Sequence, residues 1–130
     1  MAFTFTKEER LSRKTLIAQL FEKGNPVVKG FPFRFSWVYV TLENPYPVQI
    51  LFPVSKRSIP QANQRNRIRR LMRELYRMRK HELYAVLQQN NRQIALSMSY
   101  LAQQPLRMSE LKPLFDQAFH KLLHEVTKSH

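Results

Sequence analysis

The stretch QRNRIRRLMRELYRMRK, residues 64–80, predicts the central helix of the fold. Its apolar side chains recur at i, i+3, i+4 and i+7, the spacing of one helical face, and they are Ile68, Leu71, Met72 and Leu75. A stripe of this kind is typical of a helix that packs against a hydrophobic core. We therefore expect residues 64–80 to form an amphipathic helix held to a sheet by this stripe.

The adjoining face of the same helix is rich in arginine. The stretch holds eight Arg and Lys residues and one acidic residue. The basic row and its flanks consist of Arg65, Arg69, Arg73, Tyr76, Lys80, Arg70 and Arg77. Like charges four residues apart repel by roughly a few tenths of a kcal/mol, so a helix selected only for solubility would alternate Glu and Lys. Because a guanidinium can bind phosphate through two parallel hydrogen bonds, we interpret the row as an outward surface for a polyanion. The alternative is an ordinary solvated face.

The excess of positive charge is concentrated in one fifth of the chain. The net charge is +13, and residues 55–80 hold ten basic side chains against one acidic one. The other 104 residues hold twelve basic and eight acidic side chains. Such a concentrated field favours a polyanionic partner, either a nucleic acid or an anionic membrane surface.

Length and composition predict one domain over residues 1–130, with residues 1–10 and 126–130 as candidates for flexible ends. The chain contains no cysteine, so it has neither disulfides nor a thiol nucleophile. The N-terminus lacks the apolar core of a secretory signal, and no apolar stretch approaches the roughly 20 residues of a membrane span. We expect a cytoplasmic protein with no membrane partner.

The remaining pattern predicts helices at both ends and strands between them. Ser12 is a candidate cap for a helix over residues 13–23 that Gly24 ends, and Thr6 with Glu9 forms a capping pattern before it. Ser109 is a candidate cap for a last helix that reaches about residue 127. Its apolar stripe consists of Leu111, Leu114, Phe115, Ala118 and Leu122.

Three strands are predicted beside a short one near residues 26–30. Within residues 30–42, aromatic residues occupy alternate positions: Phe31, Phe33, Phe35, Trp37 and Tyr39. We expect most of these rings to pack under a helix, with one or two left exposed to stack on single-stranded bases as the alternative. Residues 47–56 are expected to pair with this strand as a hairpin, and Pro53 indicates an edge position or the end of the strand. Residues 94–101 alternate as a half-buried strand.

The sequence offers few groups for chemistry of its own. It contains one aspartate, Asp116, and its eight glutamates are dispersed, so no carboxylate cluster for a two-metal nuclease is visible. His120 and His124 share a helix face without the Glu of the H-E-x-x-H motif, and we interpret them as solvated. Two glycines cannot form a phosphate-cradling loop.

The run PVSKRSIPQANQRNRIRRLMRELYR, residues 53–77, resembles the signature of the protein subunit of bacterial ribonuclease P. The similar features are a strand that ends in V-S-K-R, a short loop, and R-N-R at the start of a helix. Residues 7–24, KEERLSRKTLIAQLFEKG, are similar to the family's basic lead-in, F-x-x-x-F helix and closing glycine. Ile17 stands where the family usually has the first aromatic residue.

The resemblance implies an α+β fold, a single-domain α-β-β-β-α-β-α sandwich of the ribosomal protein S5 domain 2-like type, with a small mixed sheet and a basic crossover helix. It further implies a non-catalytic subunit, monomeric within a holoenzyme, that assists endonucleolytic removal of the 5′ leader from precursor tRNA. The implied partners are the catalytic RNA and precursor tRNA. The implied cofactor is Mg²⁺ held mainly by the RNA, with no metal bound by protein side chains.

The resemblance also assigns residues to RNA. Those expected to contact it are Lys56, Arg57, Arg65, Asn66, Arg67, Arg69, Arg70, Arg73 and Arg77. Those expected to line a cleft for the leader, between the first helix and the sheet, are Ile17, Phe21 and Phe35. The alternative function is a structural RNA-binding protein of ribosomal type without a processing role. A second alternative, a helix lying on a membrane surface, would need the apolar stripe of residues 64–80 to be exposed.

Overall fold

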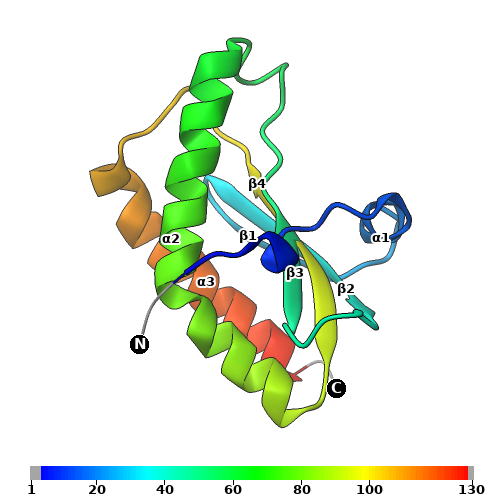
Figure 1. The fold of residues 1–130 in the computed structure, drawn as a ribbon. Coiled ribbons are helices and arrows are strands. Elements are labelled where there is room, and N and C mark those ends of the chain that lie inside the picture. The colour runs from blue at the N-terminus through cyan, green and yellow to red at the C-terminus, as the bar shows by residue number, and fades with distance from the viewer. Residues whose placement is uncertain (1–3, 129–130) are drawn as a thin grey trace.

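The structure is a computed structural model that describes residues 4–128. Its elements are η1 (Lys7–Glu9), α1 (Lys14–Leu20), β1 (Val27–Gly30), β2 (Phe33–Val40), β3 (Val48–Leu51), α2 (Ala62–Gln89), β4 (Gln93–Tyr100) and α3 (Met108–Lys128) (Figure 1). After the single 3-10 turn, the order is the α-β-β-β-α-β-α arrangement expected for an α+β sandwich. The fold class is therefore confirmed.

The sheet has four strands in the order β1-β2-β4-β3. β1 and β4 both run antiparallel to β2, whereas β3 runs parallel to β4. The predicted hairpin between β2 and β3 is therefore wrong, because β4 lies between them. A parallel pair needs a long crossover, and α2 supplies it. β3 is an edge strand and ends at Leu51, before Pro53, so both positions that Pro53 indicated are observed.

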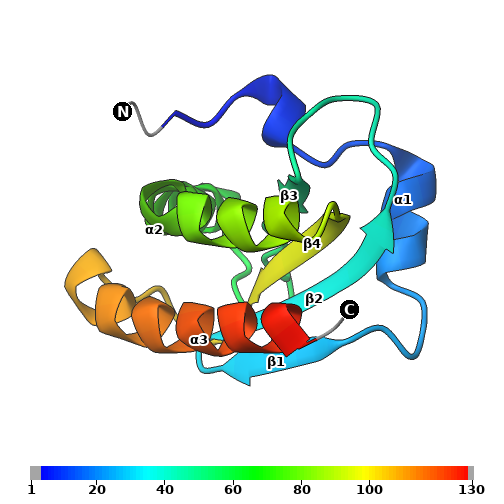
Figure 2. The same ribbon diagram turned by 90° about the horizontal axis from the view of Figure 1, so that it is seen from below.

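Helices cover both faces of the sheet, which explains the pattern of burial in β4. α2 and α3 lie on one face, and α1 lies on the other (Figure 2). In β4, Ile94, Leu96 and Met98 are buried on the side of α2 and α3, and Ala95 is buried in a smaller cluster with Leu16 and Leu20 of α1. The prediction of a half-buried strand is wrong for this reason.

The helices differ in length from their predicted bounds. α1 ends at Leu20 because the Asn25 side-chain amide donates hydrogen bonds to the carbonyls of Gln19 and Leu20, at 2.7 and 3.0 Å. Its N-cap is Arg13 rather than Ser12. α2 extends nine residues beyond the predicted end at residue 80, and α3 begins one residue before Ser109. The apolar stripe of α3 is buried, apart from Leu114, which is half-buried.

The segment before α1 lies along the outer edge of β3. Glu9 completes the predicted capping pattern, since its Oε1 accepts the backbone N–H of Thr6 at 2.9 Å. Arg10 forms an isolated parallel bridge with Ile50, and the Leu11 N–H donates to the Ile50 carbonyl at 2.9 Å. Residues 126–128 complete α3, whereas residues 1–3 and 129–130 of the expected flexible ends lie outside the described residues.

Candidate nucleic-acid interface

α2 is anchored to the core by its apolar stripe. Ile68, Met72 and Leu75 are buried and Leu71 is half-buried, as predicted. Leu83 and Leu87 are also buried, in the part of the helix beyond the predicted end. A membrane-surface helix would need these side chains free, so their burial contradicts that alternative. No helix within residues 4–128 has the length and apolarity to cross a bilayer.

Arg65 does not belong to an outward row, contrary to the prediction. Its side chain is only 9% exposed. The Nη1 atom donates hydrogen bonds to the carbonyl oxygens of Ile59 and Pro60, at 2.9 and 2.8 Å. Both acceptors belong to the loop that leads into α2. Arg65 therefore fastens that loop to the helix, and its contribution to an RNA surface is indirect.

Tyr76 and Lys80 also lie in the interior rather than on the basic row. Tyr76 is fully buried, and the Lys80 ammonium forms an ion pair with the carboxylate of Glu9. Tyr84 also donates a hydrogen bond to that carboxylate. The physical reason is the segment before α1, which packs over this side of α2. Local periodicity could not reveal the covering segment.

Four other arginines of α2, together with one asparagine, form the arginine face, which we define as Asn66, Arg67, Arg69, Arg70 and Arg73. Asn66, Arg67 and Arg70 are exposed, whereas Arg69 and Arg73 are half-buried beside the segment before α1. Burial lowers the pKa of Arg73, and the charges of Arg10 and Arg70 lower it further. Guanidinium groups thus crowd one side of the helix, as expected of a surface that receives an anion.

Three further predicted RNA contacts lie outside the arginine face. Arg77 is half-buried and paired with Glu74, with its Nη2 atom 2.6 Å from Oε1. A hydrogen bond from Arg77 lowers the pKa of Glu74. Lys56 and Arg57 are exposed in the loop after β3, where the Arg57 N–H donates to Ser55 Oγ at 3.1 Å. Lys56 and Arg57 are accessible to a ligand as they stand. Arg77 would have to leave the carboxylate of Glu74 before it could bind a phosphate.

Phe35 cannot line a cleft beside α1. Its ring is fully buried on the opposite face of the sheet, with centroids 6.5 and 6.4 Å from those of Phe115 and Phe119 in α3. The alternation of β2 explains this correction, because Phe33, Phe35 and Trp37 all point to the main core. Burial of these three rings also leaves none of them for base stacking.

The other two leader candidates do lie on the α1 side. Ile17 is half-buried in the small cluster between α1 and the sheet. Phe21 directly follows α1 and is 54% exposed, which leaves its ring open to a ligand. Of the three predicted cleft residues, the structure thus brings together only Ile17 and Phe21.

A polar patch on the α1 side of the sheet was missed by the sequence reasoning. The register places Arg34 of β2 beside Lys29 of β1 and Ser99 of β4, while Ser36 pairs with Ser97. Lys29 is exposed and Arg34 is half-buried. The signal was present in the alternation of β2, where Arg34 and Ser36 interrupt the aromatic row. Assigning them to one patch required the register.

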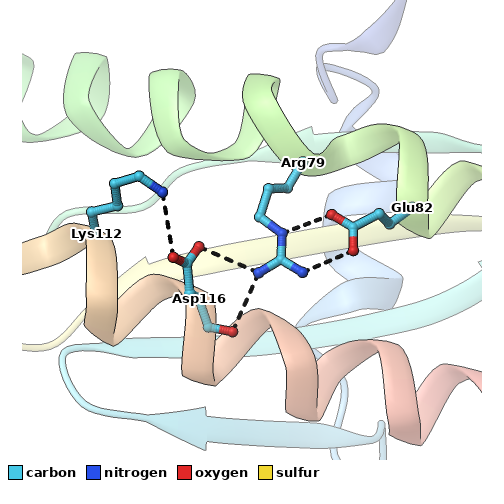
Figure 3. A network of polar contacts seen from close by, with 4 residues as sticks. All are labelled: Arg79, Glu82, Lys112 and Asp116. Carbon is cyan, nitrogen blue, oxygen red and sulfur yellow. Dashed lines mark hydrogen bonds and ion pairs between the residues drawn. The ribbon is translucent and has the colours of Figure 1, made fainter.

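The acidic side chains near α2 serve as structural partners. Arg79 binds Glu82 through two hydrogen bonds of 2.7 and 2.8 Å and reaches Asp116 of α3 at 3.3 Å (Figure 3). Lys112 approaches the other oxygen of Asp116, also at 3.3 Å. Arg79 therefore joins α2 to α3. Within residues 4–128, no three His, Cys, Asp or Glu side chains lie close enough to hold a metal ion.

Comparison with known proteins gives a consistent result. The profile of the Ribonuclease P family matches residues 5–125. The Ribonuclease P protein component of Chlorobium phaeobacteroides is 40% identical over 82 residues, which are 62% of this chain and 56% of that protein. The chain thus spans less than two thirds of that relative. The protein of the same name from Porphyromonas gingivalis is 33% identical over 76% of this chain and 70% of its own length.

A solved structure shares the fold. A mutant of the Staphylococcus aureus RNase P protein, described as defective in mRNA degradation activity, superimposes with a TM-score of 0.68. The match covers 89% of each chain at 14% sequence identity. At that identity the likeness supports the arrangement of helices and strands alone.

Proposed function

The chain belongs to the Ribonuclease P family, and we propose from this membership that it is the RNA-binding protein subunit of ribonuclease P. In this role it binds the catalytic RNA and assists the endonucleolytic removal of the 5′ leader from precursor tRNA. It works in the cytoplasm and is monomeric within the holoenzyme. One observation carries the proposal. In a chain of this family, α2 begins with the R-N-R motif and presents the arginine face on one side.

The arginine face is the proposed contact with the catalytic RNA. Arg67 and Arg70 are exposed, and Lys56 and Arg57 add two cations from the preceding loop. Guanidinium groups suit phosphate because they offer paired donors in a fixed plane. Contacts of this kind fix the position of a nucleic acid without reading its sequence, which is the task of a subunit that positions a catalyst.

The leader of precursor tRNA is proposed to lie on the α1 side of the sheet. The exposed ring of Phe21 is available for stacking, and Ile17 contributes an apolar contact in place of an aromatic one. Lys29 and Arg34 supply positive charge at the outer part of the same face. These groups suit a single strand, whose bases stack while its phosphates seek cations.

Magnesium is proposed to be held mainly by the RNA. The carboxylates of Asp116, Glu82 and Glu9 are engaged by basic side chains and link parts of the fold. Mg²⁺ is usually bound by one or two carboxylates together with phosphate oxygens and water. The catalytic RNA offers phosphate oxygens in abundance, so the protein would contribute electrostatic support rather than ligands.

Reconstitution tests the function directly. The protein is combined with the candidate catalytic RNA of its organism, and cleavage of precursor tRNA is measured at low Mg²⁺ with and without it. We expect stimulated cleavage at the mature 5′ end, because the protein's cations offset repulsion between the two RNAs. A protein that binds the RNA without stimulating cleavage would instead be a structural RNA-binding protein of ribosomal type.

A further inference from the structure

A pocket of about 350 Å³ lies where the segment before α1 meets β3 and α2. Three arginines from two distant parts of the chain line it, namely Arg10, Arg69 and Arg73. Its apolar wall includes Phe5 and Phe52, whose ring centroids are 6.1 Å apart. Within the part of the chain that the structure describes, no carboxylate lines the pocket. The pocket is therefore cationic on one side and apolar on the other.

The backbone around Arg10 is fixed before any ligand arrives. Glu9 is buried and bound by Lys80 and Tyr84 of α2. On the other side, the N–H of buried Leu11 donates to the Ile50 carbonyl at 2.9 Å. Arg10 itself is exposed between these two anchors, with its guanidinium carbon 5.7 Å from the Phe5 ring centroid. Its side chain is thus presented at the mouth of the pocket.

The two arginines of α2 have donor atoms left over. Arg69 is oriented by two hydrogen bonds, from Nε to the Phe52 carbonyl at 3.2 Å and from Nη1 to Asn66 Oδ1 at 3.1 Å. The Nε atom of Arg73 is buried and has no hydrogen-bond partner among residues 4–128. A buried donor without a partner costs about 1–3 kcal/mol, and nearby like charges add to this cost. A bound anion would offset the repulsion between these like charges.

We propose that Arg10, Arg69 and Arg73 together hold one backbone phosphodiester of the RNA, and that the neighbouring apolar wall accommodates the adjoining sugar or base. The inference rests on the proposed function and deepens it by making the segment before α1 a part of the RNA-binding surface. A phosphate fits because its oxygens can accept from several guanidinium groups at once. The ion pair of buried Glu9 with Lys80 then supports RNA binding, because it holds Arg10 at the pocket.

The first experiment uses inorganic phosphate as the probe and needs no RNA. The Nε–H resonances of the arginines are followed by NMR while phosphate is added to the folded protein at low ionic strength. We expect the Arg73 signal to shift in a saturable manner, and Arg10→Gln to weaken this response. A wild-type Arg73 signal that does not move, or one that moves equally in Arg10→Gln, would overturn the site.

The second experiment uses the catalytic RNA and measures the salt dependence of binding. Arg10→Gln and Arg73→Gln should each weaken binding about tenfold, the loss of a charged hydrogen bond. Each should also reduce the log-log salt slope by about 1. If both arginines contact the same phosphate, the double variant should lose little more slope than either single variant. Lys121→Gln, which removes an exposed charge from α3, is the matched control.

The outcomes separate this inference from the proposed function. Arg73→Lys keeps the charge but loses the planar fork, so it should retain most of the slope while weakening affinity. Variants that bind RNA like Lys121→Gln would overturn the RNA site even if free phosphate binds, and fully additive slope losses would overturn a shared phosphate. Failure of wild-type protein to stimulate cleavage would count against the proposed function, whereas the phosphate titration would still report on the pocket.

Discussion

Arg65 illustrates how a charged residue in a basic stretch can serve the fold. The pattern of residues 64–80 predicts the buried stripe with Ile68 and Met72, but it predicts a helix that ends at residue 80. The continuation to Leu83 and Leu87 shifts the centre of the buried face toward Tyr76, and Arg65 lies on that side. Its guanidinium then finds acceptors in the adjacent loop. The charge of Arg65 was evident from the sequence, but its partners were not.

We expect Arg65→Met to act mainly on the stability of the fold and only indirectly on RNA binding. Losing two hydrogen bonds from a charged donor should reduce the free energy of unfolding by about 1.5–3 kcal/mol. Arg67→Met, at an exposed position of the same helix, should change it by no more than about 0.5 kcal/mol while weakening RNA binding. Urea denaturation and RNA titration of both variants check this. Equal stability of the two variants would contradict the structural role of Arg65.

Glu9 should make folding stability depend on acid pH. Burial alone would raise its pKa, but hydrogen bonds from Lys80, the Thr6 backbone and Tyr84 outweigh burial and leave the pKa lowered. Because the unfolded state then binds the proton more tightly, this contribution is present above the ordinary Glu pKa and is lost as pH falls through the lowered value.

The test compares urea denaturation at neutral pH and near pH 3 in wild type and in Glu9→Gln. At neutral pH the substitution leaves Lys80 buried without its counter-charge, a loss of about 3–5 kcal/mol. The difference between the variant and wild type should shrink in acid. Glu43→Gln, whose side chain is 89% exposed, is the control and should have little effect. A constant difference across pH would show that the carboxylate charge is not what matters.

At the scale of elements, the sequence pattern predicted the helices and strands that residues 4–128 contain, but it could not decide how the strands pair. β3 and β2 are neighbours in sequence, and a hairpin is the simplest connection between them. β4 instead takes the central place, because both of its faces can be buried, by α1 on one side and by α2 and α3 on the other. The order of the strands therefore depends on the packing of the whole sheet. It cannot be predicted from the alternation of apolar residues in one strand.

The contact of β1 with α3 offers a test of packing between elements. A Cβ atom added to Gly30 would lie 2.7 Å from the Cβ of Ala118. We expect Gly30→Ala to lower the free energy of unfolding by about 1–3 kcal/mol, because the strand and helix must separate. Adding Ala118→Gly should recover part of that loss, even though Gly costs about 1 kcal/mol in a helix. Denaturation of both single variants and the double variant measures the coupling, and strictly additive losses would refute the contact.

At the scale of the whole molecule, the salt dependence of RNA binding depends on which basic side chains are paired within the fold and which remain for phosphates. Arg79 and Lys80 are engaged by carboxylates within the fold, which leaves the arginine face with Lys56 and Arg57 as the main surface for phosphates. About five phosphate contacts should give a log-log slope of affinity against salt near −3.5 to −4.5. Filter binding or fluorescence anisotropy between about 50 and 200 mM salt measures it.

Two pairs of substitutions localise that slope. Arg67→Gln with Arg70→Gln should reduce its magnitude by roughly 1.5 to 2, since each removes an exposed phosphate contact. Lys112→Gln with Lys121→Gln removes the same net charge from α3 and should leave the slope nearly unchanged. If net charge alone attracted RNA, the two pairs would behave alike. If the arginine face binds RNA, only the pair of substitutions in α2 should reduce the salt slope. The reason is that counterions are released only where phosphates are neutralised at close range.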